Sequence, residues 1–263
     1  MTFTVPSMAD SGFVSRSHRA IAPFVLHSPA TAADAASLLA SGAIAHAGGI
    51  DVVSRLRQGA TAESVVRLSG IDELGRIEIT AECLIVGAGV THAEVESNPI
   101  ISDVRPDLAA AWRTVGNLRI RRTGTVGGNL MAFDGTYDAA PILAAAEARL
   151  VFVEPDRTLS ESNVVDRPSS GLLLRLEIPL AGQVVFDRSL KPVVTVAVGD
   201  RYVAVSCAHE TPIVLSREWF DHTQLPDPIN DAYASASYRR RMIGVLTERA
   251  IRKHELLDSR DQA

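Results

Sequence analysis

The stretch RRTGTVGGNL at residues 121–130 crowds three glycines, two threonines and an asparagine beside two arginines. A second glycine pair stands in AGGID at residues 47–51, after a predicted apolar strand and before a predicted short helix. Consecutive glycines let successive backbone N–H groups point at one concave spot, and a helix N-terminus adds partial positive charge. Two such turns facing each other could hold a diphosphate, with side-chain hydrogen bonds from Thr125 and Asn129. Either turn alone is better explained as an ordinary turn.

The composition is that of a globular protein without a general affinity for polyanions. The chain has 263 residues, of which 46% are hydrophobic and 22% charged, and its net charge is −5. This length allows one large domain or two modest ones. A nucleic-acid partner or an anionic membrane surface needs a basic face, which the net charge argues against. The arginines between 119 and 122 are interpreted as a solvated helix or strand edge.

Cysteine content and hydropathy point to a cytoplasmic protein without a metal centre of its own. Cys83 and Cys207 are the only cysteines, whereas an iron–sulfur cluster normally takes four. They show no zinc or redox spacing, so buried free thiols in a reducing cytoplasm are expected. No segment reaches the roughly 18 consecutive apolar residues of a membrane helix, and residues 1–20 are expected to be a loose leader rather than a signal peptide.

Hydrophobic periodicity predicts helices and strands in mixed order, which favours an α+β fold with two subdomains. Helices are expected over 31–40, 91–96, 107–115 and 142–148, and along 238–257, and strands over 65–68, 76–79, 83–86, 150–153 and 172–178. Residues 193–198 and 202–206 are expected to form a hairpin, and residues 160–170 to form a loop.

Residues 84–96, LIVGAGVTHAEVE, have the strand, Gly-x-Gly and helix order of a dinucleotide-binding turn. The third glycine position, however, holds His92, whose side chain obstructs close packing of helix on strand. The interpretation preferred here is a tight turn into a short helix. His92, His209 and His222 lack mutual ligand spacing and are interpreted as solvated or helix-capping residues.

Four ordered segments together resemble one family. HAGGIDVVSRLRQG, IVGAGVTHAEVESNPII, VGNLRIRRTGTVGGNLMAFDGTYDAAPILAAAEARLVF and YRRRMIGVLTERAI are similar, in register from about Phe24 to Ile251, to the FAD-binding medium subunit of molybdenum hydroxylases. These are the flavoproteins of carbon monoxide, xanthine and nicotine dehydrogenase-type enzymes.

The resemblance implies a fold and a division of the chain. It implies a vanillyl-alcohol-oxidase-like (PCMH-type) FAD-binding domain of two α/β subdomains over residues 21–180. A CO dehydrogenase flavoprotein-like C-terminal domain of sheet and helix would follow over residues 181–255, and a tail over residues 256–263.

The resemblance also implies non-covalent FAD, with its pyrophosphate between the two glycine turns. Asp138 would contact a polar part of the cofactor, and Leu174 would pack on the isoalloxazine. Ile50 replaces a residue that often offers phosphate a hydroxyl or amide, a loss that backbone donors could compensate. The implied cofactor-binding residues are Ala47, Gly48, Gly49, Ile50, Asp51, Val52, Thr125, Gly127, Gly128, Asn129, Asp138 and Leu174. No catalytic side chain is required, because a flavin carries its own hydride chemistry.

The family's flavin receives electrons from molybdenum through iron–sulfur clusters in partner chains and passes them to NAD, a quinone or oxygen. Three hypotheses stay open at this point. The chain is the FAD subunit of such a complex with an iron–sulfur and a molybdopterin subunit, or a stand-alone FAD-dependent oxidase or monooxygenase for a small organic substrate, or a scaffold that has lost FAD.

Overall fold

The computed structural model describes residues 20–190 and 193–261, so the leader expected over residues 1–20 lies almost wholly outside the described residues. The first part of the fold contains β1 (Val25–His27), α1 (Ala32–Ala40), β2 (Ile44–His46), α2 (Ile50–Arg57) and β3 (Ser64–Arg67). Its strands form a parallel three-stranded sheet in the order β1-β3-β2. Thr31 caps α1 by accepting a hydrogen bond from the Asp34 amide at 3.2 Å.

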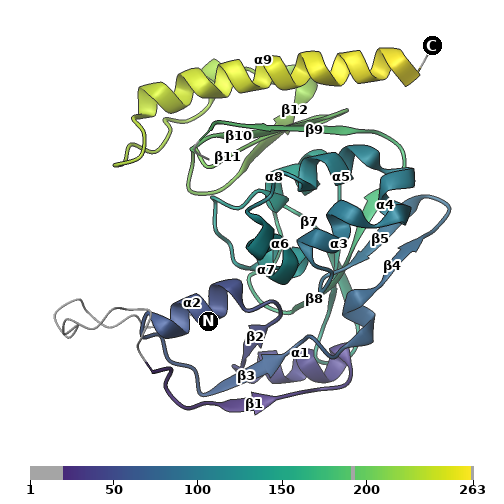
Figure 1. Ribbon diagram of the computed structural model, residues 1–263, viewed down its shortest axis with the longest axis vertical. Helices are drawn as coiled ribbons and strands as arrows, with labels where there is room; N and C mark the ends of the chain where they lie inside the picture. Colours follow the sequence, from purple (N-terminus) through teal and green to yellow (C-terminus); the bar gives the residue numbers. More distant parts are fainter. Residues whose placement is uncertain (1–19, 191–192, 262–263) are drawn as a thin grey trace.

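A second part is built on a five-stranded sheet with the order β4-β5-β8-β6-β7. Its elements are η3 (Asp72–Gly75), β4 (Ile77–Ile79), β5 (Cys83–Gly87), α3 (His92–Ser97), α4 (Pro99–Val104), α5 (Pro106–Trp112), α6 (Leu118–Thr123), α7 (Val126–Met131), α8 (Ala139–Ala145), β6 (Arg149–Val153), β7 (Leu159–Asn163) and β8 (Leu172–Pro179). Figure 1 shows α3 to α8 gathered on one side of this sheet. Leu84, Leu150 and Leu176 from its central strands are fully buried in the core.

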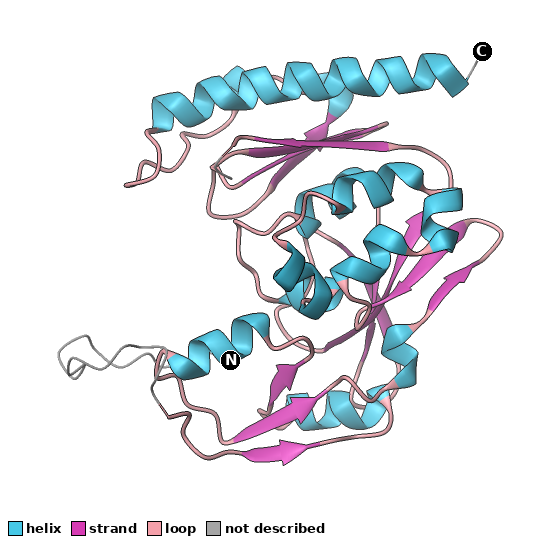
Figure 2. Ribbon diagram, in the orientation of Figure 1, coloured by secondary structure: helices cyan, strands magenta, loops and turns pink. Residues whose placement is uncertain are grey.

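The third part is a four-stranded antiparallel sheet under a long helix, at the opposite end of the molecule from the three-stranded sheet (Figure 2). It contains β9 (Val184–Arg188), β10 (Thr195–Gly199), β11 (Tyr202–Ser206), β12 (Ile213–Ser216), η4 (Arg217–Trp219), η5 (His222–Gln224) and α9 (Ala236–Asp261).

Alternation along β10 explains how this third sheet is covered on both faces. Val196 and Val198 belong to the core beneath α9, whereas Ala197 belongs to the core shared with the helices of the second part. Small residues on that second face allow close approach, since a Cβ at Gly199 would overlap the carbonyl oxygen of Ala145 at the end of α8. The sheet is therefore sandwiched between α9 and α8.

A buried ion pair ties the second part to the third. Arg105, only 2% exposed, donates to both carboxylate oxygens of Asp107 at 2.9 and 2.7 Å, and to the carbonyl of Pro179 at 2.5 Å. Asp107 in turn accepts the amide N–H of Val184 at 2.7 Å. Because each charge is satisfied by several hydrogen bonds, the pair fixes the crossing from β8 to β9.

Most elements expected from the sequence are confirmed within one or two residues, including α3, β3 to β6, β8 and the β10–β11 hairpin, whereas α5 ends at Trp112, three residues before its expected end. The dinucleotide-binding alternative is excluded, because β5 runs antiparallel to both of its neighbours. Thr91 instead caps α3 with a reciprocal Glu94 capping box.

Other details differ from expectation. The arginines near 121, expected on a helix or at a strand edge, lie on helix α6, which confirms the helix option. The expected loop at residues 160–170 begins inside β7. Strand β9 was not anticipated, and α9 runs past residue 256, where a tail was expected to begin. Among the helices of the described residues, none combines the length and apolarity needed to cross a bilayer.

Candidate functional site

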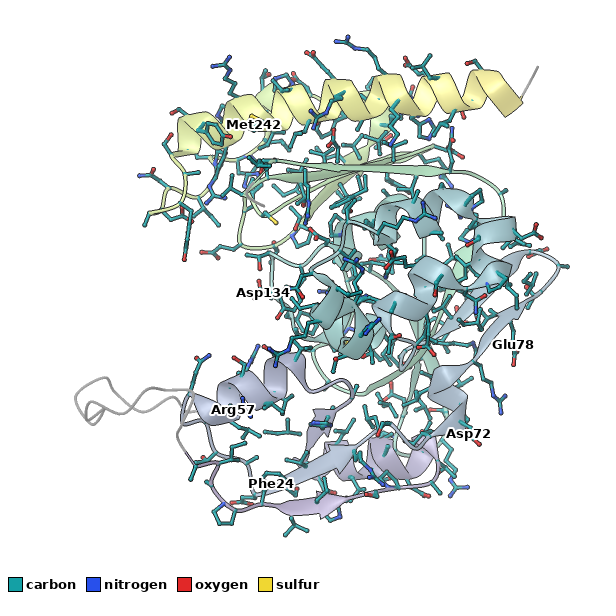
Figure 3. The ribbon with its side chains drawn as sticks, viewed as in Figure 1. Phe24, Arg57, Asp72, Glu78, Asp134 and Met242 are labelled. Atoms are coloured by element: carbon teal, nitrogen blue, oxygen red, sulfur yellow. The ribbon has the colours of Figure 1, made fainter. Side chains whose placement is uncertain are left out.

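A cavity of about 370 Å³ lies where the first part of the fold meets the second, a size typical of small-molecule and cofactor sites. Both glycine turns line it, and Arg188 reaches it from the third part. Its wall contains Gly48, Gly49, Gly89, Gly116, Gly124, Gly127, Gly128 and Gly171. Walls so rich in glycine let a ligand approach the backbone closely. In Figure 3, Arg57 at the end of α2 and Asp134 after α7 lie on the same side of the molecule.

The first glycine turn ends in an uncapped helix. Gly49 has φ +75°, a left-handed conformation that favours glycine, and it is the N-cap of α2. No side chain caps this helix within the described residues, and the first intrahelical bond runs from Val53 N–H to the Gly49 carbonyl. The amides of Ile50, Asp51 and Val52 therefore lack helical acceptors and are available to an anion in the cavity.

Gly48 is the point where the two turns touch. A Cβ on Gly48 would overlap the carbonyl oxygen of Thr123 and lie 2.7 Å from its carbonyl carbon and 3.1 Å from the Cα of Gly124. Only a glycine lets the backbone before α2 pass this close to the backbone before α7. This contact brings residues 47–51 close to residues 121–130, the two glycine-containing segments that the sequence analysis expects to face each other.

The second glycine turn differs from its prediction, because its glycines lie inside α7 and their amides are already bonded. Gly127 N–H donates to the Ala88 carbonyl at 2.8 Å, and Gly128 N–H to the Thr125 hydroxyl at 3.0 Å. The prediction that these amides point at the ligand was therefore wrong. Gly127 instead allows close packing, since its Cβ would come within 2.7 Å of the Ala88 carbonyl oxygen.

On this second wall, side chains rather than backbone amides offer hydrogen-bonding groups to a ligand. Asn129 Oδ1 and Asp138 Oδ1 are both buried without a hydrogen-bond partner within the described residues, and both residues line the cavity. Buried polar atoms in native proteins are nearly always satisfied, so two orphans at one cavity indicate a polar ligand. Together with the uncapped start of α2, they fit a cofactor that carries both an anionic diphosphate and hydroxyl or amide groups.

Asp138 sits in an unusual electrostatic environment. Burial raises the pKa of its carboxyl from 3.8 to about 6, while the Arg188 guanidinium, 3.5 Å away, acts in the opposite direction. Arg188 comes from β9, so this ion pair links the cavity to the third part of the fold. A carboxyl so poised changes protonation near neutral pH.

This shift predicts a pH-dependent stability. The folded protein holds the Asp138 proton more tightly than the unfolded chain does, so the carboxyl's charged form costs stability. The free energy of unfolding should fall by up to about 3 kcal/mol as pH rises from about 4 to about 6, at 1.36 kcal/mol per pKa unit. We therefore expect Asp138→Asn, without FAD, to be more stable than the wild type at pH 7 and similar to it at pH 4.

Urea unfolding of both proteins across this pH range measures the effect. His92, whose pKa is lowered to about 4, contributes an opposite slope, since its neutral form is favoured by folding and that stability is lost as pH falls from about 6.5. Because His92 is present in both proteins, its contribution cancels in their difference. A stability difference that stays constant with pH would contradict the prediction.

Eleven of the twelve residues implied for the cofactor line this cavity; Leu174 does not. Leu174 packs against the hydrophobic core, and its carbonyl accepts the Ala88 amide at 3.0 Å. The cavity wall on that side consists of Gly171, Leu172 and Leu173. The contact between the isoalloxazine and an apolar residue of this segment remains a prediction.

The interpretation of the histidines requires correction. His92 is 1% exposed and lines the cavity, and His209 is 8% exposed, so neither is a solvated residue. Sequence reasoning also missed Arg188 and Tyr137 as lining residues. Tyr137 lies close enough to Asp51, across the cavity, for that carboxylate to contribute to the rise in the tyrosine pKa, after burial itself. No sequence spacing relates these residues, because folding alone brings them together.

Away from this cavity, one cluster of possible metal-ligating side chains lies among the described residues. Asp200, His254 and Asp258 place one nitrogen or oxygen each within 4.8 Å of the others. The Arg217 guanidinium, however, lies 3.1 Å from His254 Nδ1. A positive charge so close to the imidazole opposes a bound cation, and we interpret the group as an ion-pair network that holds α9 to the β10–β11 turn.

Comparison with known proteins defines the class. Residues 21–179 match the family described as the FAD binding domain in molybdopterin dehydrogenase, and the chain belongs to this family. The family's description thus supplies the cofactor, FAD, that the cavity's donors and orphaned oxygens fit.

Particular relatives are more distant. The chain is 31% identical over 121 residues to the nicotine 6-hydroxylase medium subunit of Paenarthrobacter nicotinovorans, a match covering 45% of this chain and 43% of that protein. It is 27% identical over 137 residues to the carbon monoxide dehydrogenase medium chain of Hydrogenophaga pseudoflava, covering 51% and 48%. The matched segment therefore spans less than half the length of these curated relatives.

Solved structures share the fold over most of the chain. Carbon monoxide dehydrogenase from Hydrogenophaga pseudoflava superposes with a TM-score of 0.82 at 19% identity, over 90% of this chain and 99% of that one. Quinoline 2-oxidoreductase from Pseudomonas putida 86 gives 0.80 at 21% identity, over 90% and 98%. The expected α+β fold is thereby confirmed.

Proposed function

We propose that this chain is the FAD-binding subunit of a molybdenum hydroxylase-type dehydrogenase, and that it relays electrons from iron–sulfur clusters in a partner subunit to an external acceptor. The observation that carries the proposal is the cavity between the two glycine turns, with an uncapped helix start on one wall and two orphaned oxygens on the other. NAD, a quinone and oxygen are the candidate acceptors.

The chain's residues have three tasks in this proposal. The amides of Ile50, Asp51 and Val52 bind the diphosphate through the positive end of α2, whose Gly49 cap leaves them free. Asn129 and Asp138 orient the polar middle of the cofactor with their unpartnered oxygens. Leu172 and Leu173, with other apolar residues of the wall, exclude water from the ring.

FAD supplies the hydride and single-electron chemistry when bound, so no side chain of this protein is assigned a catalytic step. The metal centres are assigned to partner subunits, one with iron–sulfur clusters and one with molybdopterin. Cys207, one of two cysteines in the sequence, is buried, and burial raises the pKa of its thiol to about 12. A thiol held in its protonated form is a poor cluster ligand.

We place the FAD-binding domain at residues 21–180 and the C-terminal domain at residues 181–255, and we propose the cytoplasm as the compartment. The break between β8 and β9 supports this boundary, because β9 is the first strand of the sheet that packs on α9. In this division, Arg188 of the C-terminal domain lines the cofactor cavity and pairs with Asp138.

Purification of the tagged chain from its native host tests the assembly. We expect it to co-purify with an iron–sulfur chain and a molybdopterin chain, and the absorption spectrum to contain both flavin and iron–sulfur bands. A yellow chain recovered alone, whose flavin is reduced by a small organic substrate without partners, would contradict the electron-relay role and support a stand-alone flavoenzyme.

A further inference from the structure

His92 occupies a place in the cavity that neither the motif nor the family resemblance explains. It is the first residue of α3, its side chain is 1% exposed, and its backbone N–H donates to the Gly124 carbonyl at 3.0 Å. A Cβ on Gly124 would lie 3.5 Å from His92 Nε2, so the imidazole edge packs against the chain just before the second glycine turn. His92 therefore faces the junction of the two turns.

One ring nitrogen of His92 is already engaged. Trp112, itself 1% exposed, donates its indole N–H to His92 Nδ1 at 3.1 Å. Indole nitrogen can only donate, so Nδ1 must be the unprotonated, accepting nitrogen. In a neutral imidazole the proton then sits on Nε2, which Trp112 thereby fixes as a donor.

The surroundings keep this ring neutral. Burial and the nearby Arg121 guanidinium both lower the pKa of His92, to about 4. Arg121 on α6 is paired with Glu96 on α3 at 2.7 Å and donates to the carbonyls of Val115 and Gly116. The carboxylate nearest to His92 along α3, Glu94, is bonded to Thr91.

Within the described residues, Nε2 of His92 has no hydrogen-bond acceptor, yet the residue lines the cavity. We propose that His92 donates the Nε2 hydrogen to an oxygen of the bound cofactor at the junction of the two glycine turns, and that Trp112 fixes the tautomer that makes this possible. This inference rests on the proposed FAD site. A neutral donor adds hydrogen bonding at the diphosphate without adding a titrating charge.

Nitrogen NMR of the wild-type chain tests the geometry without a substitution. We expect one of the 7 histidines, identified by its absence in His92→Gln, to be neutral with its proton on Nε2 at pH 7. Its Nε2 signal should shift when FAD is added. In Trp112→Phe the second tautomer should appear. A proton on Nδ1, a charged ring, or no shift on addition of FAD would overturn the inference.

FAD titration supplies the energetic test. His92→Leu removes both the donor and the acceptor, and we expect its Kd to rise about ten- to a hundredfold, the loss for a hydrogen bond to a charged group. His92→Gln, which keeps a donor and an acceptor, should stay within about threefold of the wild type. His254→Gln is the matched control, since His254 is equally buried but belongs to the ion-pair network of α9, and this variant should bind FAD normally.

The outcomes separate the two proposals. Unchanged affinity in His92→Leu, while the wild type binds FAD, overturns the role of His92 alone. Failure of the wild type itself to bind overturns the proposed function. If His92→Leu does not fold, the Nε2 signal of the wild type still decides, because its shift on addition of FAD does not depend on that variant.

Discussion

Gly48→Ala is expected to abolish FAD retention, lowering affinity by more than about a hundredfold. The added methyl group would overlap the Thr123 carbonyl oxygen and come within 2.7 Å of the Thr123 carbonyl carbon and 3.1 Å of the Gly124 Cα. These are backbone atoms, which no change of rotamer can move aside. The start of α2 must then separate from the start of α7, and the two walls of the cavity no longer converge on one diphosphate.

A matched glycine shows whether the effect is local. Gly70→Ala adds the same methyl group where no heavy atom lies within 4 Å, and it should retain FAD like the wild type. Both variants can be compared by equilibrium dialysis with FAD and by circular dichroism. Flavin retention by Gly48→Ala equal to that of Gly70→Ala would show that the contact between the two turns does not form the site.

Gly127→Val carries the second-largest expected effect. Its Cβ would lie 2.6 Å from the Ala88 Cβ and 2.7 Å from the Ala88 carbonyl oxygen, and its amide already bonds that carbonyl. Relief of the overlap would push α7 away from the chain that follows β5, moving Asn129 out of position. FAD affinity should fall by at least about tenfold, equivalent to 1.4 kcal/mol, and the protein should lose about 1–3 kcal/mol of stability through overpacking.

Gly128→Ala provides the contrast, because its Cβ would meet only the Thr125 hydroxyl, at 2.8 Å. That oxygen caps α7 and can adjust by a rotation of its side chain, so the loss of affinity should be smaller than for Gly127→Val. Flavin fluorescence titration of the two variants measures the difference. Equal losses would favour the sequence-based idea that both glycines serve the ligand through their amides.

The sequence predicted the site through local signals. The two glycine pairs indicated a diphosphate site, and the family resemblance of the segments around them implied the eleven residues that line the cavity. The same signal misjudged how α7 works. Nothing in TVGGN shows that Val90 and Ala88 already accept the amides of Val126 and Gly127.

Long-range partners explain the rest of what sequence reasoning missed. Arg188 lies fifty positions from Asp138 and reaches it only because β9 packs against α8, whose N-cap is Asp138. In the sequence, His92 only breaks a glycine motif. The proposed donor role of its Nε2 depends on the hydrogen bond from Trp112, which the sequence does not show. Strand β9 was not predicted because charged residues interrupt its apolar pattern. Asp187 pairs with Arg249 of α9, and Arg188 pairs with Asp138.

Titration of the flavin-free chain with FAD, followed by flavin fluorescence, tests the central claim most directly. The two-turn cavity predicts saturable one-to-one binding with a Kd of about 1 µM or tighter, equivalent to about 8 kcal/mol, and loss of that binding in Gly48→Ala but not in Gly70→Ala. Absence of saturation at about 100 µM FAD, a weaker limit than the cavity predicts, in a folded wild-type chain would contradict the account.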